Sequence, residues 1–152
     1  MWQKLMDRRV QLPLLFSAVV ATTATLGSLF FSNVLGYVPC ELCWLQRICM
    51  YPLVPLFFTA LIVGDPKVYR YAFTPVVAGL GISLFHNIIY YRANFGPHPT
   101  VFTACTLQGS SCTVKYIEWY GFVTIPLLSA AAFLLILGGL VVMRRMHQRN
   151  LS

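Results

Sequence analysis

The 152 residues are 58% hydrophobic and only 10% charged, whereas a soluble domain carries about 25% charged residues, so an ordinary soluble globular fold is excluded. The formal net charge of +7 would suit a nucleic-acid-binding protein, but the basic residues gather in short segments between apolar runs, and we expect no nucleic-acid partner. Each apolar run reaches the roughly 20 residues that a helix needs to cross a bilayer, so a membrane protein is predicted.

Four membrane-spanning helices are predicted, and together they leave too little chain for a separate soluble domain. The predicted fold class is therefore an all-α membrane protein, a four-transmembrane-helix bundle in a single domain covering residues 1–152. In chain order the predicted spans and outer loops are 12–35 (span), 36–43 (loop), 44–63 (span), 71–91 (span), 92–120 (loop) and 121–143 (span).

The basic residues predict how these spans are oriented. Eight of the eleven Lys and Arg residues lie near the termini or between the second and third spans: Lys4, Arg8, Arg9, Lys67, Arg70, Arg144, Arg145 and Arg149. By the positive-inside rule both termini lie in the cytoplasm, and the loops 36–43 and 92–120 lie on the outer face. Four of the five cysteines then face a compartment in which disulfides persist, and only Cys49 lies inside a span.

The second span begins with a C-x-x-C motif in the stretch PCELCWLQR, residues 39–47. If a helix begins near Cys40, Cys43 lies in or near its first turn, where the helix dipole and unpaired N–H groups stabilise a thiolate. Arg47 lies one turn beyond Cys43 on the same helix face, so its positive charge favours the Cys43 thiolate further. The pattern predicts a reactive thiol, whereas Cys49 points away from this face and is expected to be inert.

A polar stripe interrupts the outer half of the third span at Ser83, His86, Asn87 and Tyr90, which share one helix face. An ionisable residue inside a span is a candidate functional residue, although hydrogen bonding between packed helices would also explain a buried histidine. His86 and Arg47 lie at similar depths from the same membrane face. We therefore expect both to belong to one site beside the C-x-x-C pair.

A second cysteine pair, Cys105 and Cys112, lies in the second outer loop, and the upstream prolines Pro97 and Pro99 favour an extended segment before Cys105. A purely structural role for either pair would add only about 2 to 2.5 kcal/mol per disulfide, and lipid already holds the helices. A zinc site built from the four outer cysteines is a further alternative. The wide spacing of the second pair and the oxidising outer face disfavour it, and we expect no metal.

These features together resemble a known family. CELCWLQR on the second of four spans, Leu84-Phe85-His86 on the third and a cysteine pair in the second outer loop are similar to the DsbB family, most of all to its compact BdbC branch from Gram-positive bacteria. The resemblance covers nearly the whole chain. The loop cysteines are closer together than in the DsbB proteins of Gram-negative bacteria, and there is little room for the extra interfacial helix of those proteins.

The resemblance implies a quinone-dependent thiol-disulfide oxidoreductase. Such proteins reoxidise an extracytoplasmic thioredoxin-fold oxidase of the DsbA or BdbD type, and so support disulfide formation in exported proteins. Electrons would pass through two cysteine pairs to a membrane quinone, either menaquinone or ubiquinone. In the order of electron flow, the cysteines are Cys105 and Cys112 followed by Cys40 and Cys43.

The resemblance also implies positions for the cofactor and the protein. Arg47 matches the arginine of the family's quinone site, and His86 is similar to its histidine in the third span. We expect a multi-pass monomer in the bacterial cytoplasmic membrane, in contact with lipid, with its active cysteines on the outer face.

Three other protein classes remain open. A vitamin K epoxide reductase-like protein would use the same chemistry, but such proteins usually carry an additional span. A tetraspan assembly subunit with structural disulfides would not need Arg47 inside the membrane. A metal-transport accessory protein would favour acidic or histidine-rich outer loops, whereas these loops contain only Glu41, Glu118 and His98 as acidic or histidine residues.

Overall fold

The computed structural model describes residues 8–95 and 124–149, and all regular structure in these ranges is helical. The helices are α1 (Arg8–Asn33), α2 (Glu41–Met50), α3 (Leu53–Val63), α4 (Tyr69–Phe95) and α5 (Ile125–Arg149). Four stretches are long and apolar enough to cross a membrane: Val10–Asn33, Glu41–Val63, Tyr69–Ala93 and Ile125–Arg149. The prediction of an all-α membrane protein with four spans is therefore confirmed, and the cytoplasmic location of the termini stays a prediction.

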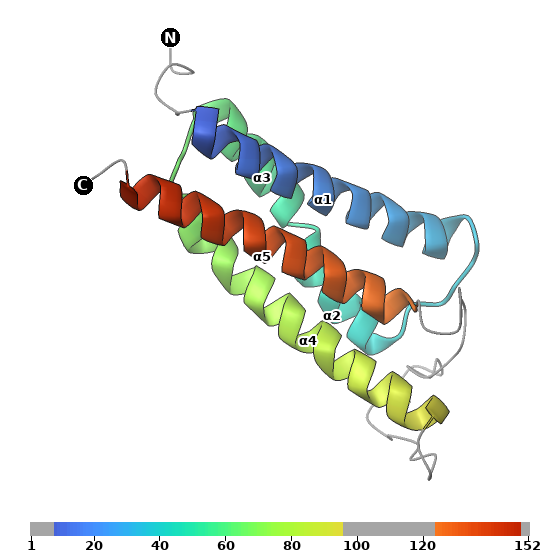
Figure 1. The fold of residues 1–152 in the computed structure, drawn as a ribbon. Helices are drawn as coiled ribbons and strands as arrows, with labels where there is room; N and C mark the ends of the chain where they lie inside the picture. Colours follow the sequence, from blue (N-terminus) through green and yellow to red (C-terminus); the bar gives the residue numbers. More distant parts are fainter. Residues whose placement is uncertain (1–7, 96–123, 150–152) are drawn as a thin grey trace.

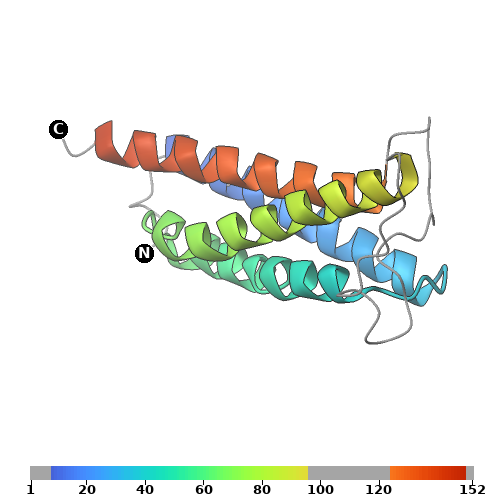
Figure 2. The ribbon, with the colours of Figure 1, turned by 90° about the horizontal axis from the view of Figure 1, so that it is seen from below.

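The helices run up and down through one bundle (Figure 1). The start of α1, the turn between α3 and α4 and the end of α5 lie at one end of the bundle. The end of α1, the start of α2, the end of α4 and the start of α5 lie at the opposite end, as the view from below also shows (Figure 2). The most extensive helix contacts are those of α5, which packs against both α4 and α1.

The second span is divided into two helices rather than being one kinked helix. Pro52 and Pro55 have no N–H groups, so the helical hydrogen bonds to the carbonyls of Ile48 and Tyr51 cannot form. The carbonyl of Tyr51 accepts instead from the N–H of Val54 at 3.2 Å, which is a tighter turn than that of an α-helix. This break makes α2 a separate ten-residue segment that carries most of the C-x-x-C stretch.

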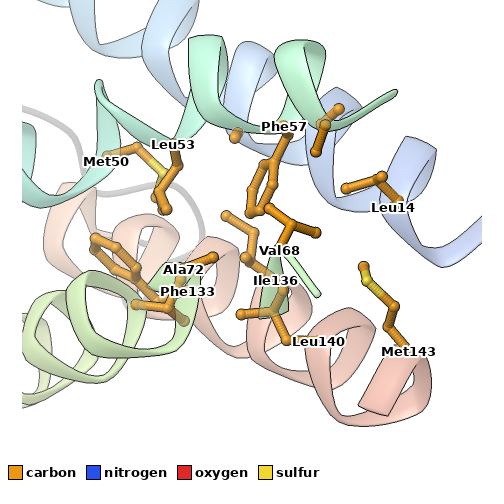
Figure 3. Close-up of a cluster of buried hydrophobic side chains, with 14 of the residues drawn as sticks. Leu14, Met50, Leu53, Phe57, Val68, Ala72, Phe133, Ile136, Leu140 and Met143 are labelled. Carbon is orange, nitrogen blue, oxygen red and sulfur yellow. The ribbon is translucent and has the colours of Figure 1, made fainter. Parts of the chain in front are cut away.

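The apolar core fills the half of the bundle that holds the start of α1 and the end of α5 (Figure 3). Its large, fully buried side chains come from α1, α3, α4, α5 and the segment before α4: Leu14, Leu53, Phe57, Val68, Val76, Phe133, Ile136, Leu140 and Met143. Lipid tails are as apolar as this core, so the hydrophobic effect does not drive the helices together within the membrane. Close packing of the buried side chains holds them together instead. Several buried positions in the other half are polar, and that half holds the site described below.

Glycines allow the helices of this core to approach closely. A Cβ atom added at Gly79 of α4 would overlap the ring of Phe133 in α5, and one added at Gly139 of α5 would overlap the Ser17 hydroxyl of α1. At Gly81, two residues beyond Gly79, an added Cβ atom would meet nothing within 4 Å. Small size is therefore required at Gly79 and Gly139 but not at Gly81.

Replacing Gly79 with alanine should lower the thermal unfolding midpoint of the protein in detergent, because overpacking a filled interior costs about 1–3 kcal/mol. Gly81→Ala is the matched control on the same helix. Its midpoint should stay the same or rise, since alanine favours a helix over glycine by about 1 kcal/mol. Equal midpoints for the two variants would show that α4 and α5 are not in close contact at Gly79.

Candidate functional site

The C-x-x-C motif lies at the start of α2. Cys40 is the N-cap residue, with an extended backbone (φ −73°, ψ 171°), and the helix begins at Glu41. The N–H of Trp44 donates to the carbonyl of Cys40 at 3.0 Å, which closes the first helical turn. Cys43 therefore lies in the first turn, as the sequence predicts, where backbone N–H groups have no helical acceptor.

Cys40, Cys43 and His86 meet at this end of α2. The sulfur atoms of Cys40 and Cys43 are 3.0 Å apart, and the pair is in the reduced, dithiol form. Nε2 of His86 lies 3.9 Å from Sγ of Cys40, although the two residues are 46 positions apart in the chain. Cys40 is 5% exposed and His86 is 2% exposed. The packing of α4 against α2 thus places a buried imidazole beside the buried thiol.

Gln46 belongs to the same cluster, and the sequence analysis did not identify it. Its side-chain nitrogen lies 3.1 Å from Nδ1 of His86, and its own side chain is buried. When this amide donates to Nδ1, the ring proton of a neutral His86 lies on Nε2, which faces Cys40. The available signal was a polar amide inside a span, three residues after Cys43 on the same helix face.

The polar stripe of α4 has two different roles. All four of its members are buried: Ser83, His86, Asn87 and Tyr90. The side-chain nitrogen of Asn87 donates to the carbonyls of Ser83 at 2.8 Å and of Pro126 at 2.9 Å, so Asn87 attaches α4 to the first turn of α5. His86 reaches α2 instead. One residue of the stripe therefore positions helices, and its neighbour contacts the cysteine pair.

Arg47 connects α2 to α1. Its Nη2 donates to the carbonyl of Ser28 at 3.3 Å, and its guanidinium lies 5.5 Å from the centre of the Trp44 ring. The hydroxyl of Tyr51 lies 3.4 Å from the Ser28 hydroxyl, so two residues of this segment reach the same point on α1. Ser28 lies 19 positions before Arg47 on another helix, so the helical period does not predict this contact.

A cavity of about 530 Å³ lies beside the cluster, between α1, α2, α4 and α5. One part of its lining is the chemical group described above: Cys40, Cys43, Gln46, Arg47 and His86. Most of the remaining wall is apolar and comes from α1 and α5, including Val19, Val20, Ala24, Leu128, Ala131 and Leu135. The site is therefore a pair of thiols that opens into an apolar space within the spans.

The sequence model of the family described as "Disulfide bond formation protein DsbB" matches residues 9–143. This chain belongs to the DsbB family. The resemblance drawn from the C-x-x-C stretch, the third span and the loop cysteines is thus confirmed. Family membership and four candidate spans together identify a membrane disulfide oxidoreductase.

Individual relatives support the same assignment. "Disulfide bond formation protein C" of Bacillus subtilis is 43% identical over 122 residues, which cover 80% of this chain and 84% of the relative. "Probable disulfide formation protein C" of Halalkalibacterium halodurans is 41% identical over 132 residues, or 86% of this chain and 92% of the relative. A "Probable disulfide formation protein" of Metapseudomonas resinovorans is 36% identical over 132 residues, covering 87% and 89%. No solved structure matches the chain significantly.

The electrostatics of this DsbB-family site favour a thiolate at Cys40. A hydrogen bond from the Cys43 thiol, and then the hydrogen bond and charge of His86, lower the Cys40 pKa from 9.0 to about 4, although burial acts in the opposite direction. The sequence analysis had placed the thiolate on Cys43, because it considered the helix start and Arg47 but not the imidazole beside Cys40.

Of the other three cysteines, the structure describes only Cys49. Cys49 packs against the apolar core and does not line the cavity, which agrees with its expected distance from the Cys43–Arg47 face. Cys105 and Cys112 lie outside the residues that the structure describes. Their pairing and their electron-transfer roles therefore stay predictions.

Reduced protein with serine at Cys49, Cys105 and Cys112 should show one thiolate in its ultraviolet absorbance at neutral pH, lost as the pH falls through about 4. The sign follows from the lowered Cys40 pKa, because the charged form persists below the usual thiol range of about 8.5. Adding Cys43→Ala should move the transition upward most, since it removes the largest cause, and His86→Ala should move it less. A thiolate that forms only in the usual range would contradict this assignment.

Proposed function

We propose that this protein reoxidises an extracytoplasmic thioredoxin-fold oxidase of the DsbA or BdbD type and passes the electrons to a membrane quinone. This activity would support disulfide formation in exported proteins. The observation that carries the proposal is the position of the C-x-x-C pair on an apolar cavity that Arg47 also lines. Exchange with a protein thiol needs only an accessible disulfide, whereas an apolar cavity beside the pair suits a lipid-soluble acceptor.

The cavity has the properties that a quinone would need. Its volume of about 530 Å³ lies within the range of roughly 300–1,000 Å³ found for small-molecule sites. Arg47 carries five N–H donors, and among the described residues its only hydrogen-bond partner is the carbonyl of Ser28. Its other donors are available for a quinone oxygen, whose negative charge grows on reduction. These features fit menaquinone and ubiquinone equally.

The electron and proton balance is simple. Oxidation of the Cys40–Cys43 dithiol to a disulfide releases two electrons and two protons, and a bound quinone supplies an acceptor for both. Nε2 of His86 lies 3.9 Å from the Cys40 sulfur and can take a proton from the thiol pair when the Gln46 oxygen accepts from Nδ1–H, because the Nε2 lone pair then faces the cysteines. His86 would therefore act in proton transfer at the cysteine pair as well as at the quinone.

Electrons would enter through Cys105 and Cys112. α4 ends at Phe95 and α5 begins at Ile125, both at the end of the bundle where Cys40 lies (Figure 1). The intervening sequence, which contains both loop cysteines, is thus attached at the end that carries the C-x-x-C pair. This placement supports disulfide exchange between the two pairs.

We also propose that the protein is a single-domain monomer of the bacterial cytoplasmic membrane, with its C-x-x-C pair on the outer face. The end of the bundle opposite Cys40 carries exposed basic side chains: Arg8, Lys67, Arg70, Arg144, Arg145 and Arg149. At the Cys40 end, Arg92 is the exposed basic residue within the described ranges. This asymmetry supports a cytoplasmic location for the basic end.

Arg47→Met should raise the Michaelis constant for quinone by about tenfold, which is the effect of losing a charge-assisted hydrogen bond of about 1.5 kcal/mol. Arg47→Lys should raise it less, because it keeps the charge but loses the planar fork. Disulfide exchange with the reduced partner should change little in either variant, since that step does not use the cavity. Steady-state quinone reduction and single-turnover exchange measure the two effects separately.

The control for this experiment is Arg92→Met, which removes an exposed arginine from the last turn of α4. It should leave both rates unchanged. If the Arg47 variants reduce quinone with the wild-type Michaelis constant and are only less stable, Arg47 connects α1 and α2 and the acceptor site lies elsewhere.

Electron entry can be tested by trapping. Cys112→Ser should accumulate a mixed disulfide between Cys105 and the partner oxidase, because the second cysteine is no longer present to resolve it. Non-reducing electrophoresis followed by mass mapping of the linked peptides would detect it. Cys105→Ser is the matched variant, and a mixed disulfide seen only in that variant would reverse the order of the two cysteines.

A further inference from the structure

We propose that the reduced Cys40–Cys43 pair and His86 form a binding site for a thiophilic divalent metal ion, with Zn²⁺ as the representative ion. Binding would keep both cysteines as metal-bound thiolates and so block their oxidation to a disulfide. This site is distinct from the four-cysteine zinc site that the sequence analysis disfavoured, because His86 takes the place of the loop cysteines. It needs neither a quinone nor a partner oxidase, so it stands or fails independently of the proposed function.

The positions of the donor atoms carry this inference. The two sulfur atoms and the imidazole nitrogen all lie within 4.8 Å of one another. Tetrahedral zinc with Zn–S and Zn–N bonds of about 2.3 and 2.0 Å would place its sulfurs about 3.8 Å apart and sulfur and nitrogen about 3.5 Å apart. The observed Cys40–Cys43 and Cys40–His86 separations are 3.0 and 3.9 Å. These two separations differ from the tetrahedral values by less than one ångström, and the third pair of donor atoms, Cys43 and His86, also lies within 4.8 Å.

Gln46 supports the imidazole as a ligand. A histidine that binds a metal through Nε2 usually donates its Nδ1–H to an oxygen, which fixes the ring. Gln46 lies 3.1 Å from Nδ1 and is buried with it. Rotation of its amide by a half turn presents the oxygen to Nδ1–H and leaves the Nε2 lone pair directed at the cysteines. The same side chain can thus pair with the neutral Nε2–H tautomer and with the metal-bound form of His86.

The surroundings select the class of ion. Within residues 8–95 and 124–149, no Asp or Glu lines the cavity, so these residues offer none of the carboxylate ligands that Mg²⁺ and Ca²⁺ prefer. Two thiolates and an imidazole favour Zn²⁺ and similar thiophilic ions. Cys40, Cys43 and His86 all line the cavity, which leaves room for water as a fourth ligand.

The redox state of the cysteines would control binding. Each ion that binds two thiols forms two metal–sulfur bonds and releases two protons, or fewer where a sulfur is already a thiolate. In the disulfide form the same two sulfurs are bonded to each other and no longer supply thiolate ligands. Binding would therefore be confined to the reduced protein, and an ion bound there would have to leave before the pair could be oxidised.

The test uses the full chain in detergent with serine at Cys49, Cys105 and Cys112, so that only the Cys40–Cys43 pair remains. Co²⁺ is the probe, because its thiolate charge-transfer and tetrahedral visible bands report the ligands. The reduced protein should bind one Co²⁺ per chain, and Zn²⁺ should displace it. The oxidised protein should give no thiolate band. His86→Ala should weaken binding at least tenfold, and Gln46→Leu should weaken it about tenfold to a hundredfold.

His147→Ala is the matched control, since this histidine lies in the last turn of α5 at the opposite end of the bundle. It should leave binding unchanged. X-ray absorption of the zinc-loaded protein with His86 intact provides a measurement that does not depend on how the variants fold, and it should show two sulfur ligands and one imidazole. Zinc bound without imidazole scattering, or bound equally by the oxidised protein, would overturn the proposal.

Discussion

Polar side chains inside a membrane span must find partners within the protein, because the bilayer core contains no water. Two side chains of the polar stripe of α4 find such partners on different helices, and the site depends on both. Asn87 donates to the carbonyl of Pro126 and attaches α4 to α5, whereas His86 contacts Cys40 and Gln46 at the start of α2. One helix face therefore determines how three helices meet and which group lies beside the cysteine pair.

The bundle divides its tasks along its length. Close apolar packing, with glycines at the tightest helix contacts, fills the half that holds the start of α1 and the end of α5. The other half contains the cavity and the buried polar groups. A cavity removes packing contacts and so costs stability, and the well-packed half offsets that cost. The break at Pro52 separates the short helix with the C-x-x-C pair from α3, although Met50 at the end of this short helix still belongs to the apolar core.

Much of the fold and part of the site follow from the sequence. Four apolar runs of sufficient length predict four spans, because lipid requires every backbone group to bond within its own helix. Pro39 and the motif after it predict a helix start near Cys40, and the helical period predicts that Ser83, His86, Asn87 and Tyr90 share a face. These inferences depend only on residues within one or two helical turns of each other, so the amino-acid sequence is sufficient to make them.

The contacts between helices needed the tertiary structure. The period of a helix shows which residues share a face, but the rotation and depth of the neighbouring helix decide what that face meets. The sequence could therefore place His86 and Arg47 at a similar depth, but it could not show that His86 lies against Cys40 or that Arg47 reaches Ser28. The sequence did not indicate a role for Gln46, because that role depends on contact with the imidazole of His86, 40 residues further along the chain. The low pKa of Cys40 has both origins: its largest cause is the hydrogen bond from Cys43 in the same motif, whereas the contribution of His86 depends on the packing of α4 against α2.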